Sequence, residues 1–355
     1  MSGTSLDGID AALVDLSGAQ PKLIGTHYQA YQAALKDALL ALHHPAHDEL
    51  HQSQIIAIQL ARAYADATRS LLQKTGMTSA QIQAIGCHGQ TVRHRPEHGY
   101  TIQLNNAALL AELTGIHVVS DFRSRDIAAG GQGAPLVPAF HDKVLRHPNI
   151  HRAILNIGGI ANLTDLPCNG VTTGFDCGPG NLLMDAWISK HQGKPYDKDG
   201  AWASKGKVIP LLLQKLLAEP FFPAVPPKST GRDLFNLNWL ESFLSGNEAP
   251  EDVQTTLLAL TGDSIALAVR NFCGTAKELY LCGGGAHNGA LVSHLQHALP
   301  QCKIQKTEEL GIAADWMEAI AFAWLAQQTL HLRPSNLPAV TGARHACVLG
   351  AIYPA

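Results

Sequence analysis

Short runs of apolar residues alternate along the chain with longer segments in which apolar residues recur at helical spacing. Residues 8–16, 101–104 and 116–122 are predicted to be strands, and residues 83–90 to be a buried strand that leads into a glycine turn. Residues 52–74 stop before Gly76 and are predicted to form an amphipathic helix that ends at this glycine.

The second half of the chain repeats this style with longer segments. The predictions are a strand–turn–strand over 151–166, a helix over 252–272, a strand, triple glycine and helix over 278–299, and a helix over 316–330 with Asp315 as a possible N-cap. Residues 128–140 are predicted to be a glycine- and proline-rich loop and a lobe boundary. The alternation of strands and helices predicts an α/β protein with mixed sheets and two lobes.

Composition narrows the function classes. The 355 residues contain 26 Lys+Arg and 29 Asp+Glu, a net charge of −3, which argues against binding nucleic acid through phosphate neutralisation and against a polybasic membrane-surface protein. The hydrophobic fraction of 46% is typical of globular proteins. The seven cysteines form no CxxC pair, which favours reduced thiols in a cytoplasm, and the absence of zinc-like spacing predicts no structural metal.

Three glycine-rich turns follow or lie between strand-like runs, at residues 1–10, 156–162 and 281–291. Glycine lets backbone N–H groups approach an anion closely, and a following helix N-terminus adds partial positive charge. Neither GxxxxGK[ST] nor a GxGxxG that opens a βαβ unit is present. A single turn of this kind is more often only a turn, but the three together resemble the sugar-kinase/Hsp70/actin superfamily, in which two lobes close over ATP.

A more specific resemblance covers nearly the whole chain in order. The segments that carry it are MSGTSLDGID (1–10), IGCHGQTVRH (85–94), DFRSRDIAAGGQGAPLVPAFH (121–141), LNIGGIANL (155–163), GFDCGPGNLLMDAW (174–187), PKSTGR (227–232), CGGGAHN (282–288) and WMEAIAFAWLA (316–326). Together they are similar to the anhydro-N-acetylmuramic acid kinase family.

The resemblance implies a two-lobed, actin-like (ribonuclease H-like) ATPase fold with a cleft between the lobes. Residues 1–127, joined by 330–355, would form the N-terminal lobe, and residues 128–329 the C-terminal lobe. It also implies a cytoplasmic, usually dimeric enzyme of peptidoglycan recycling. Such enzymes open the 1,6-anhydro ring of anhydro-N-acetylmuramate with water and phosphorylate O6 from ATP.

The resemblance implies ATP with Mg²⁺ as substrate and ion, and no tightly bound prosthetic group. The expected ATP-binding residues are Gly3, Thr4, Ser5, Leu6, Asp7, Gly8, Ile9, Asp10, Gly158, Gly159, Gly283, Gly284 and Gly285. Asp7 or Asp10 is expected to reach the ion through water, because Mg²⁺ keeps much of its hydration shell. As the alternative, Asp7-Gly8 is an ordinary hairpin turn.

Asp176 lies beside Gly178-Pro179-Gly180, where a carboxylate can face a cleft or close an Asx-type turn. By resemblance it is the general base that activates water against the anomeric carbon. Asp185 is a possible second carboxylate, although a role in helix structure or lobe contacts is favoured for it.

Thr91, Arg125 and Glu318 are the sugar-binding residues that the resemblance implies. Arginine can pair bidentately with the lactyl carboxylate of a muramic acid. Arg123 is a weaker candidate for the same contact, and Glu318 is also what a helix dipole favours in a first turn. His88 and His94 are more simply hydrogen-bonded structural residues, and the basic loop 228–232 fits a solvated or dimer-contact role as well as a phosphate contact.

One departure from the family concerns the first residues. Family members usually carry several residues before the MSGTS segment, so we expect either an upstream start or a weakened nucleotide site. Two other functions stay open at this point. One is a related kinase acting on another hexosamine, and the other is a non-catalytic, nucleotide-binding protein with an actin-like fold.

Overall fold

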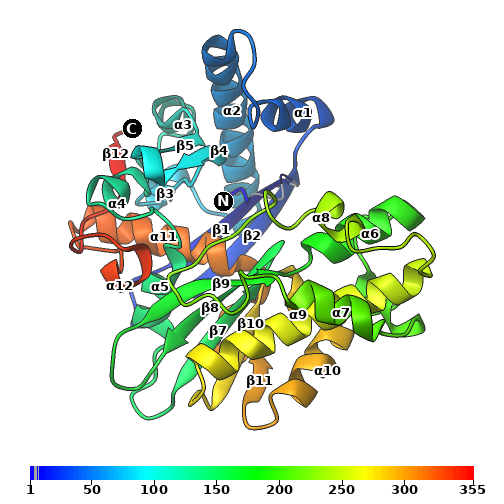
Figure 1. Cartoon of the computed structure of the whole chain (residues 1–355). Coiled ribbons are helices and arrows are strands. Elements are labelled where there is room, and N and C mark those ends of the chain that lie inside the picture. Colours follow the sequence, from blue (N-terminus) through cyan, green and yellow to red (C-terminus); the bar gives the residue numbers. More distant parts are fainter. Residues whose placement is uncertain (4–5, 7) are drawn as a thin grey trace. The chain divides into compact units, whose positions relative to one another are not determined.

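A computed structural model describes residues 1–3, 6 and 8–355 of the chain. Its contacts divide the protein into two compact units (Figure 1). Unit 1 comprises Met1–Val144 and Trp316–Ala355, and unit 2 comprises Leu145–Asp315. Each unit mixes parallel and antiparallel strand pairs with helices, so the predicted α/β class with mixed sheets and two lobes is confirmed.

Unit 1 is built on small sheets covered by helices. The hairpin β1 (Gly8–Asp15) and β2 (Lys22–Ala30), the hairpin β4 (Gln90–Arg95) and β5 (Tyr100–Leu104), and a sheet in the order β12 (Ala351–Tyr353), β6 (Val118–Ser120) and β3 (Ile85–Gly86) make up its strands. Its helices are α1 (Ala33–Ala41), α2 (Glu49–Thr75), α3 (Ala107–Thr114), α4 (Ser124–Ala128), α5 (Val137–Leu145, whose last residue lies in unit 2), α11 (Met317–Leu330) and α12 (Pro338–Thr341).

The long helix α2 forms much of the unit 1 core. Leu60 and Ala61 are fully buried on it and belong to the same apolar cluster as Leu110 of α3 and Val118 of β6. The helix ends as its sequence predicts, because Gly76 adopts the left-handed conformation at φ 67° that glycine tolerates best.

Unit 2 contains a five-stranded sheet in the order β11 (Lys303–Lys306), β10 (Glu278–Cys282), β7 (Arg152–Ile157), β8 (Ile160–Leu166) and β9 (Thr173–Pro179). Strands β7, β8 and β9 form an antiparallel meander, and β10 and β11 continue the sheet in parallel with β7. This order is that of the ribonuclease H-like fold, as predicted.

Helices cover the sheet of unit 2. They are α6 (Leu182–Gln192), α7 (Pro210–Leu217), α8 (Leu237–Glu241), α9 (Pro250–Phe272) and α10 (Gly289–Ala298). The 23-residue α9 contacts β8, β9, α6, α7 and α10 (Figure 1). It buries an apolar stripe that includes Val253, Leu257 and Ile265. On the sheet side, Ile154 and Leu155 of β7 are fully buried.

The boundaries between the two units differ from those expected for the lobes. Residues 128–144 and 316–329 belong to unit 1 rather than to the C-terminal lobe. The reason is side-chain packing, because Phe140 of α5 meets Trp324 of α11 edge-on with ring centroids 5.9 Å apart, and Gln327 donates a hydrogen bond to the Leu16 carbonyl. Helix α5 also begins at Val137, inside the expected loop 128–140.

Candidate active site

Asp176 lies on β9, opposite Asn162 of β8, four residues before the β9–α6 junction at Gly180. Its Oδ2 accepts a hydrogen bond of 2.9 Å from the Thr230 N–H, and its own N–H donates to the Lys228 carbonyl at 3.1 Å. Burial raises the pKa of the carboxyl to about 6, against the opposing effects of the Thr230 hydrogen bond and the Lys228 ammonium. A carboxyl of this kind can accept a proton close to neutral pH.

The second glycine turn joins β7 to β8 in the same unit. The N–H groups of Gly180 and Asn181, at the start of α6, each donate 2.8 Å hydrogen bonds to the carbonyls of Gly159 and Gly158. A Cβ at Gly180 would lie 2.3 Å from the Gly158 oxygen, so only glycine fits there. The carbonyl side of the turn is therefore tied to α6, and its N–H side is the one that could face an anion.

The third glycine turn follows β10. Gly283 has φ 77°, and a Cβ there would lie 2.3 Å from the Asn156 side chain, while a Cβ at Gly285 would lie 2.2 Å from Ile157. The turn thus packs against the end of β7, where the second turn begins. Both turns and Asp176 lie on one sheet, so unit 2 brings together these predicted phosphate, adenosine and base elements.

Asp185 is, like Asp176, a carboxyl of unit 2 with a raised pKa. Burial, together with the negative charge of Asp197, raises its pKa to about 7, and the guanidinium of Arg232 opposes this rise. Arg232 lines a cavity of about 340 Å³ with Leu182 and Leu183 of α6, the helix that carries Asp185.

In unit 1, a hydrogen-bond network surrounds Arg123. Its Nε and Nη2 donate to His88 Nε2 at 3.1 and 2.9 Å, and its Nη1 donates to the Gly133 carbonyl at 2.7 Å. His88 Nδ1 lies 2.7 Å from the Gly89 carbonyl, which can only accept, so Nδ1 carries the proton and Nε2 is the acceptor. Burial and the Arg123 cation hold the pKa of His88 well below its usual value, and this imidazole is neutral.

The remaining unit 1 candidates vary in exposure. Arg125 is exposed on α4, whereas Arg123 is half-buried. Burial lowers the pKa of Arg123 to about 10, and the carboxylates of Glu318 and Asp126 oppose that effect. Glu318 is therefore close enough to Arg123 for the two charges to interact. Thr91 faces Gln103 across the β4–β5 hairpin and accepts a 3.1 Å hydrogen bond from its amide.

The first glycine segment is described only in part, because Thr4, Ser5 and Asp7 lie outside the described residues. The Gly3 carbonyl accepts a hydrogen bond from the Gln90 side chain, and Leu6 and Ile9 are 3% exposed in the unit 1 core. Side chains of Leu6 and Ile9 therefore serve packing, and only their backbone is suited to a phosphate. Gly8, Ile9 and Asp10 begin β1, opposite Ala30, Gln29 and Tyr28 of β2.

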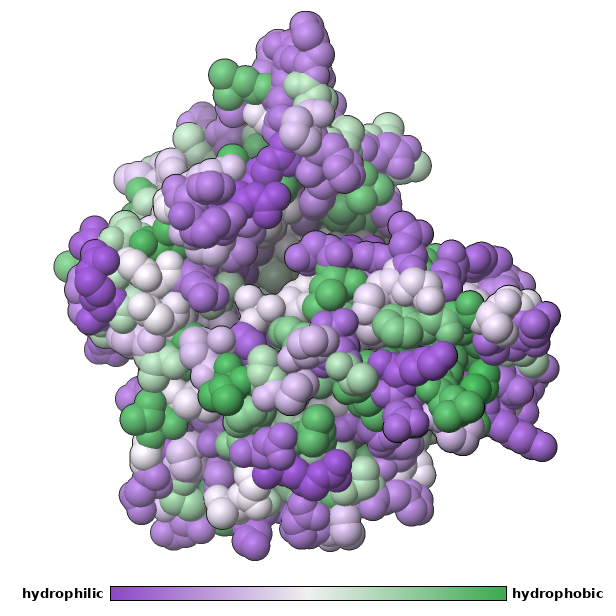
Figure 2. Space-filling view, in the orientation of Figure 1, coloured by the Kyte–Doolittle hydropathy of each residue, from purple (hydrophilic) through white to green (hydrophobic). Residues whose placement is uncertain are grey.

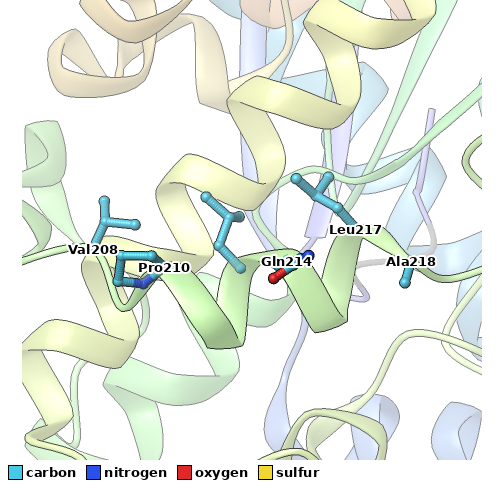
Figure 3. Close-up of a pocket in the computed structure, with 6 residues that line it drawn as sticks. Val208, Pro210, Gln214, Leu217 and Ala218 are labelled. Carbon is cyan, nitrogen blue, oxygen red and sulfur yellow. The ribbon is translucent and has the colours of Figure 1, made fainter.

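A surface groove of about 470 Å³ runs along α7, lined by Val208, Pro210, Leu213, Gln214, Leu217 and Ala218 (Figure 3). Apolar surface gathers over this part of unit 2 in Figure 2. None of the six lining residues is charged or nucleophilic, so the groove offers no group for acid–base or phosphoryl chemistry.

Within residues 1–3, 6 and 8–355, no three His, Cys, Asp or Glu side chains are grouped as metal ligands. In that same part, no helix has the length and apolar character needed to span a bilayer.

Some features of the site were not accessible to sequence reasoning. The Arg123–His88 pair joins residues 35 positions apart, and the Thr230–Asp176 contact joins residues 54 positions apart. Asp315 was expected to cap α11, but Trp316 occupies that position, and the Asp315 carboxylate instead contacts His287 Nε2 at 2.8 Å. The PKSTGR segment was the one available signal for Lys228 and Thr230.

Comparisons with known proteins agree over the full length of the chain. The family model described as anhydro-N-acetylmuramic acid kinase matches residues 1–355. Curated relatives of that description are 58% identical in Nitrosospira multiformis, covering 100% of this chain and 98% of the relative, and 52% identical in Pseudomonas syringae pv. syringae, with the same coverage.

Among solved structures, the likeness is distant. The activator of the 2-hydroxyisocaproyl-CoA dehydratase from Clostridium difficile with bound ADPNP is 12% identical, with a TM-score of 0.45 over 92% of this chain and 98% of that one. The full-length family match and the identity of 52–58% to these curated relatives are far stronger evidence of relationship than this structural likeness. The chain belongs to the anhydro-N-acetylmuramic acid kinase family.

Proposed function

We propose that the chain is an ATP-dependent kinase that opens the 1,6-anhydro ring of 1,6-anhydro-N-acetylmuramate with water and phosphorylates O6. The products are N-acetylmuramate 6-phosphate and ADP, and the reaction belongs to peptidoglycan recycling. The observation that carries the proposal is Asp176, a half-buried carboxyl with a pKa of about 6 on the same sheet as two glycine turns. The family membership supplies the substrate class.

Asp176 is proposed as the general base. As the water oxygen bonds to the anomeric carbon, the carbon–O6 bond breaks and its electron pair stays on O6. One proton of the water passes to Asp176, and O6 bonds to the γ-phosphorus of ATP as the bond to ADP breaks. The base is needed because water is a weak nucleophile near neutral pH, and a positioned base typically contributes about 10²–10⁴ in rate.

ATP, entering as its Mg²⁺ complex, is assigned to the glycine turns. The N–H side of Gly158–Gly159 and the backbone of the first segment would contact phosphate oxygens, and Gly283–Gly285 would lie against the adenosine. Fixed N–H dipoles of this kind stabilise the charge that spreads over the transferred phosphoryl group. Asp10 on β1 remains a proposed water-mediated contact to the ion, and so does Asp7, which lies outside the described residues.

For the lactyl carboxylate of the sugar, unit 1 supplies two arginines. The resemblance implies Arg125, which is exposed, and of the two we propose Arg123 as the contact because its surroundings are more favourable. The guanidinium of Arg123 is fixed by His88 and the Gly133 carbonyl, and its hydrogen bonds to described residues use three of its five N–H groups. Thr91 and Glu318 are proposed as further sugar contacts.

The proposed setting is a cytoplasmic homodimer, as the family resemblance implies. Size measurement in solution tests the dimer, and cell fractionation tests the location.

The reaction itself is tested with ATP, 1,6-anhydro-N-acetylmuramate and H₂¹⁸O, followed by mass spectrometry of the products. We expect one ¹⁸O atom at the anomeric position and a phosphate on O6. Phosphorylation without the label would indicate a kinase for another hexosamine. ATP binding without turnover would indicate a nucleotide-binding protein that is not an enzyme.

A further inference from the structure

The segment 228–230 touches the proposed base at two points, although the proposed function gives it no role. The Asp176 N–H donates to the Lys228 carbonyl at 3.1 Å, and the Thr230 N–H donates to Asp176 Oδ2 at 2.9 Å. The segment therefore lies beside Asp176 of β9, with the Thr230 backbone at the carboxylate.

Lys228 fixes the segment in this position. Its ammonium donates to the carbonyls of Phe221 and Phe222 at 3.0 and 2.8 Å, and it lies 4.7 Å from the centre of the Phe221 ring and 5.7 Å from that of Phe272. Two carbonyls and two aromatic faces satisfy this cation within unit 2. Its charge thus serves to anchor Thr230 beside the base.

The two oxygens of Asp176 are not equivalent in this arrangement. Oδ2 is occupied by the Thr230 N–H, whereas Oδ1 accepts no hydrogen bond from any residue that the structure describes. A carboxylate oxygen can accept two hydrogen bonds, and the proton of an attacking water needs an open one. Oδ1 has both of its acceptor positions open to a ligand, against one for Oδ2, and is therefore the better suited of the two oxygens to receive the proton.

The Thr230 hydroxyl is the unexplained group of this region. Its Oγ1 is buried and has no hydrogen-bond partner among the described residues. Nearly all buried polar atoms in proteins are hydrogen-bonded, because leaving one unsatisfied destabilises the folded state. A buried hydroxyl next to a base with one open oxygen is thus suited to a partner that comes from outside the chain.

We propose that the Thr230 hydroxyl is a catalytic residue that holds the attacking water together with Asp176 Oδ1. A water in a buried site typically makes about three hydrogen bonds, and these two oxygens, with the anomeric centre in front, would orient its lone pair. The proton leaves the water for Oδ1, and Thr230 neither gains nor loses a proton overall. This inference rests on the proposed function, because it requires water as a reactant.

The test compares Thr230→Val with Thr230→Ser. Both variants keep the backbone N–H that donates to Asp176, and only the serine keeps the hydroxyl. Losing one neutral hydrogen bond of about 1–1.5 kcal/mol corresponds to about a tenfold fall in kcat. We expect this fall for Thr230→Val, with KM for ATP and for the sugar within about twofold of the parent, and we expect Thr230→Ser to retain most of the rate.

Rates are expressed per ATP-binding site measured by calorimetry, so that any misfolded fraction does not count. Thr230→Ala repeats the loss of the hydroxyl without the bulk of valine, and it should resemble Thr230→Val. The inference is overturned if Thr230→Val keeps the parent kcat, or if valine and serine lower it equally. Failure of the proposed function is distinct, because the unsubstituted protein would then form no ¹⁸O-labelled product.

Discussion

The two charged groups on which the proposed reaction depends are held in opposite ways. In unit 1, Arg123 makes three hydrogen bonds to fixed acceptors, and burial lowers its pKa only to about 10, so it remains a cation at neutral pH. In unit 2, Asp176 has one occupied oxygen, and burial raises its pKa to about 6. The first arrangement fixes a charge and the second allows a charge to change.

This difference matches two chemical requirements. A group that binds a substrate carboxylate works best with a constant charge and a fixed orientation, which a guanidinium provides. A general base must exchange a proton during each turnover, so its pKa is most useful near the working pH. The predictions below test whether the two regions are divided in this way between binding and catalysis.

The largest effect is expected for Asp176→Asn. The amide keeps the size of the carboxyl and an oxygen for the Thr230 N–H, but it cannot accept the proton of water. We expect kcat to fall by about 10²–10⁴, with ATP affinity nearly unchanged because other segments hold the phosphates. Single-turnover product formation and calorimetric ATP binding are the measurements.

Asp185→Asn is the matched control, because Asp185 is also a carboxyl of unit 2 with a raised pKa. Its kcat should stay within about tenfold of the parent value. Loss of a general base would lower kcat by at least about 10², so the two outcomes are distinguishable. The assignment of the base fails if Asp176→Asn stays within tenfold of the parent, and Asp185 or Glu318 would then take its place as the candidate.

A smaller effect, confined to substrate binding, is expected in unit 1. Arg123→Lys keeps the charge, but an ammonium cannot reproduce the planar fork that contacts both His88 and the Gly133 carbonyl. Losing a hydrogen bond to a charged group costs about 1.5–3 kcal/mol. The KM for the sugar should therefore rise by about 10- to 100-fold, while KM for ATP and kcat change much less.

Arg125→Lys provides the comparison, since Arg125 is exposed on the same helix. Steady-state kinetics with each substrate varied in turn should show little change in this variant. A larger rise in sugar KM for Arg125→Lys than for Arg123→Lys would assign the carboxylate contact to Arg125, as the resemblance originally implied.

The sequence predicted best what is local. Helices α2 and α9 and the β7–β8 hairpin follow from periodicity and a glycine turn within one segment, and the structure confirms them. The buried strand predicted over 83–90 is shorter, with β3 at Ile85–Gly86 and β4 beginning at Gln90. Helix α5 was missed because the glycines and prolines before it resemble a continuous loop.

The same limit applies to the candidate site. Glycine turns and Asp176 are visible in the sequence because each motif is contiguous, and the structure brings two of the turns and Asp176 onto one sheet. The partners of the charged groups are not visible, because His88 meets Arg123, and Thr230 meets Asp176, only after the chain has folded. Those contacts set the orientations of the two groups, and burial, which also arises only on folding, shifts their pKa values.

The smallest effect concerns stability, and it follows from the sign of the Asp176 shift. The pKa in the folded protein is about 6, above the usual 3.8, so folding favours the protonated carboxyl. The stability that this preference provides is fully present below about pH 4 and is lost as the pH rises through about 6. Asp176→Asn has no carboxyl to ionise and should escape this loss.

The free energy of unfolding of Asp176→Asn, relative to the parent, should therefore increase between about pH 4 and pH 6 and stay constant above that range. A shift of about two pKa units sets an upper limit of about 3 kcal/mol on this gain, since one unit corresponds to about 1.36 kcal/mol. Denaturant unfolding of the ligand-free protein at a series of pH values measures it, and the difference between the two proteins removes the titration of all shared groups.

For Asp185→Asn, the increase should extend to about pH 7, because the pKa of that carboxyl is about 7. A stability difference that does not change with pH would mean that Asp176 ionises normally in the folded protein. Its charge near neutral pH would then be as constant as that of Arg123, and the contrast between the two groups would fail.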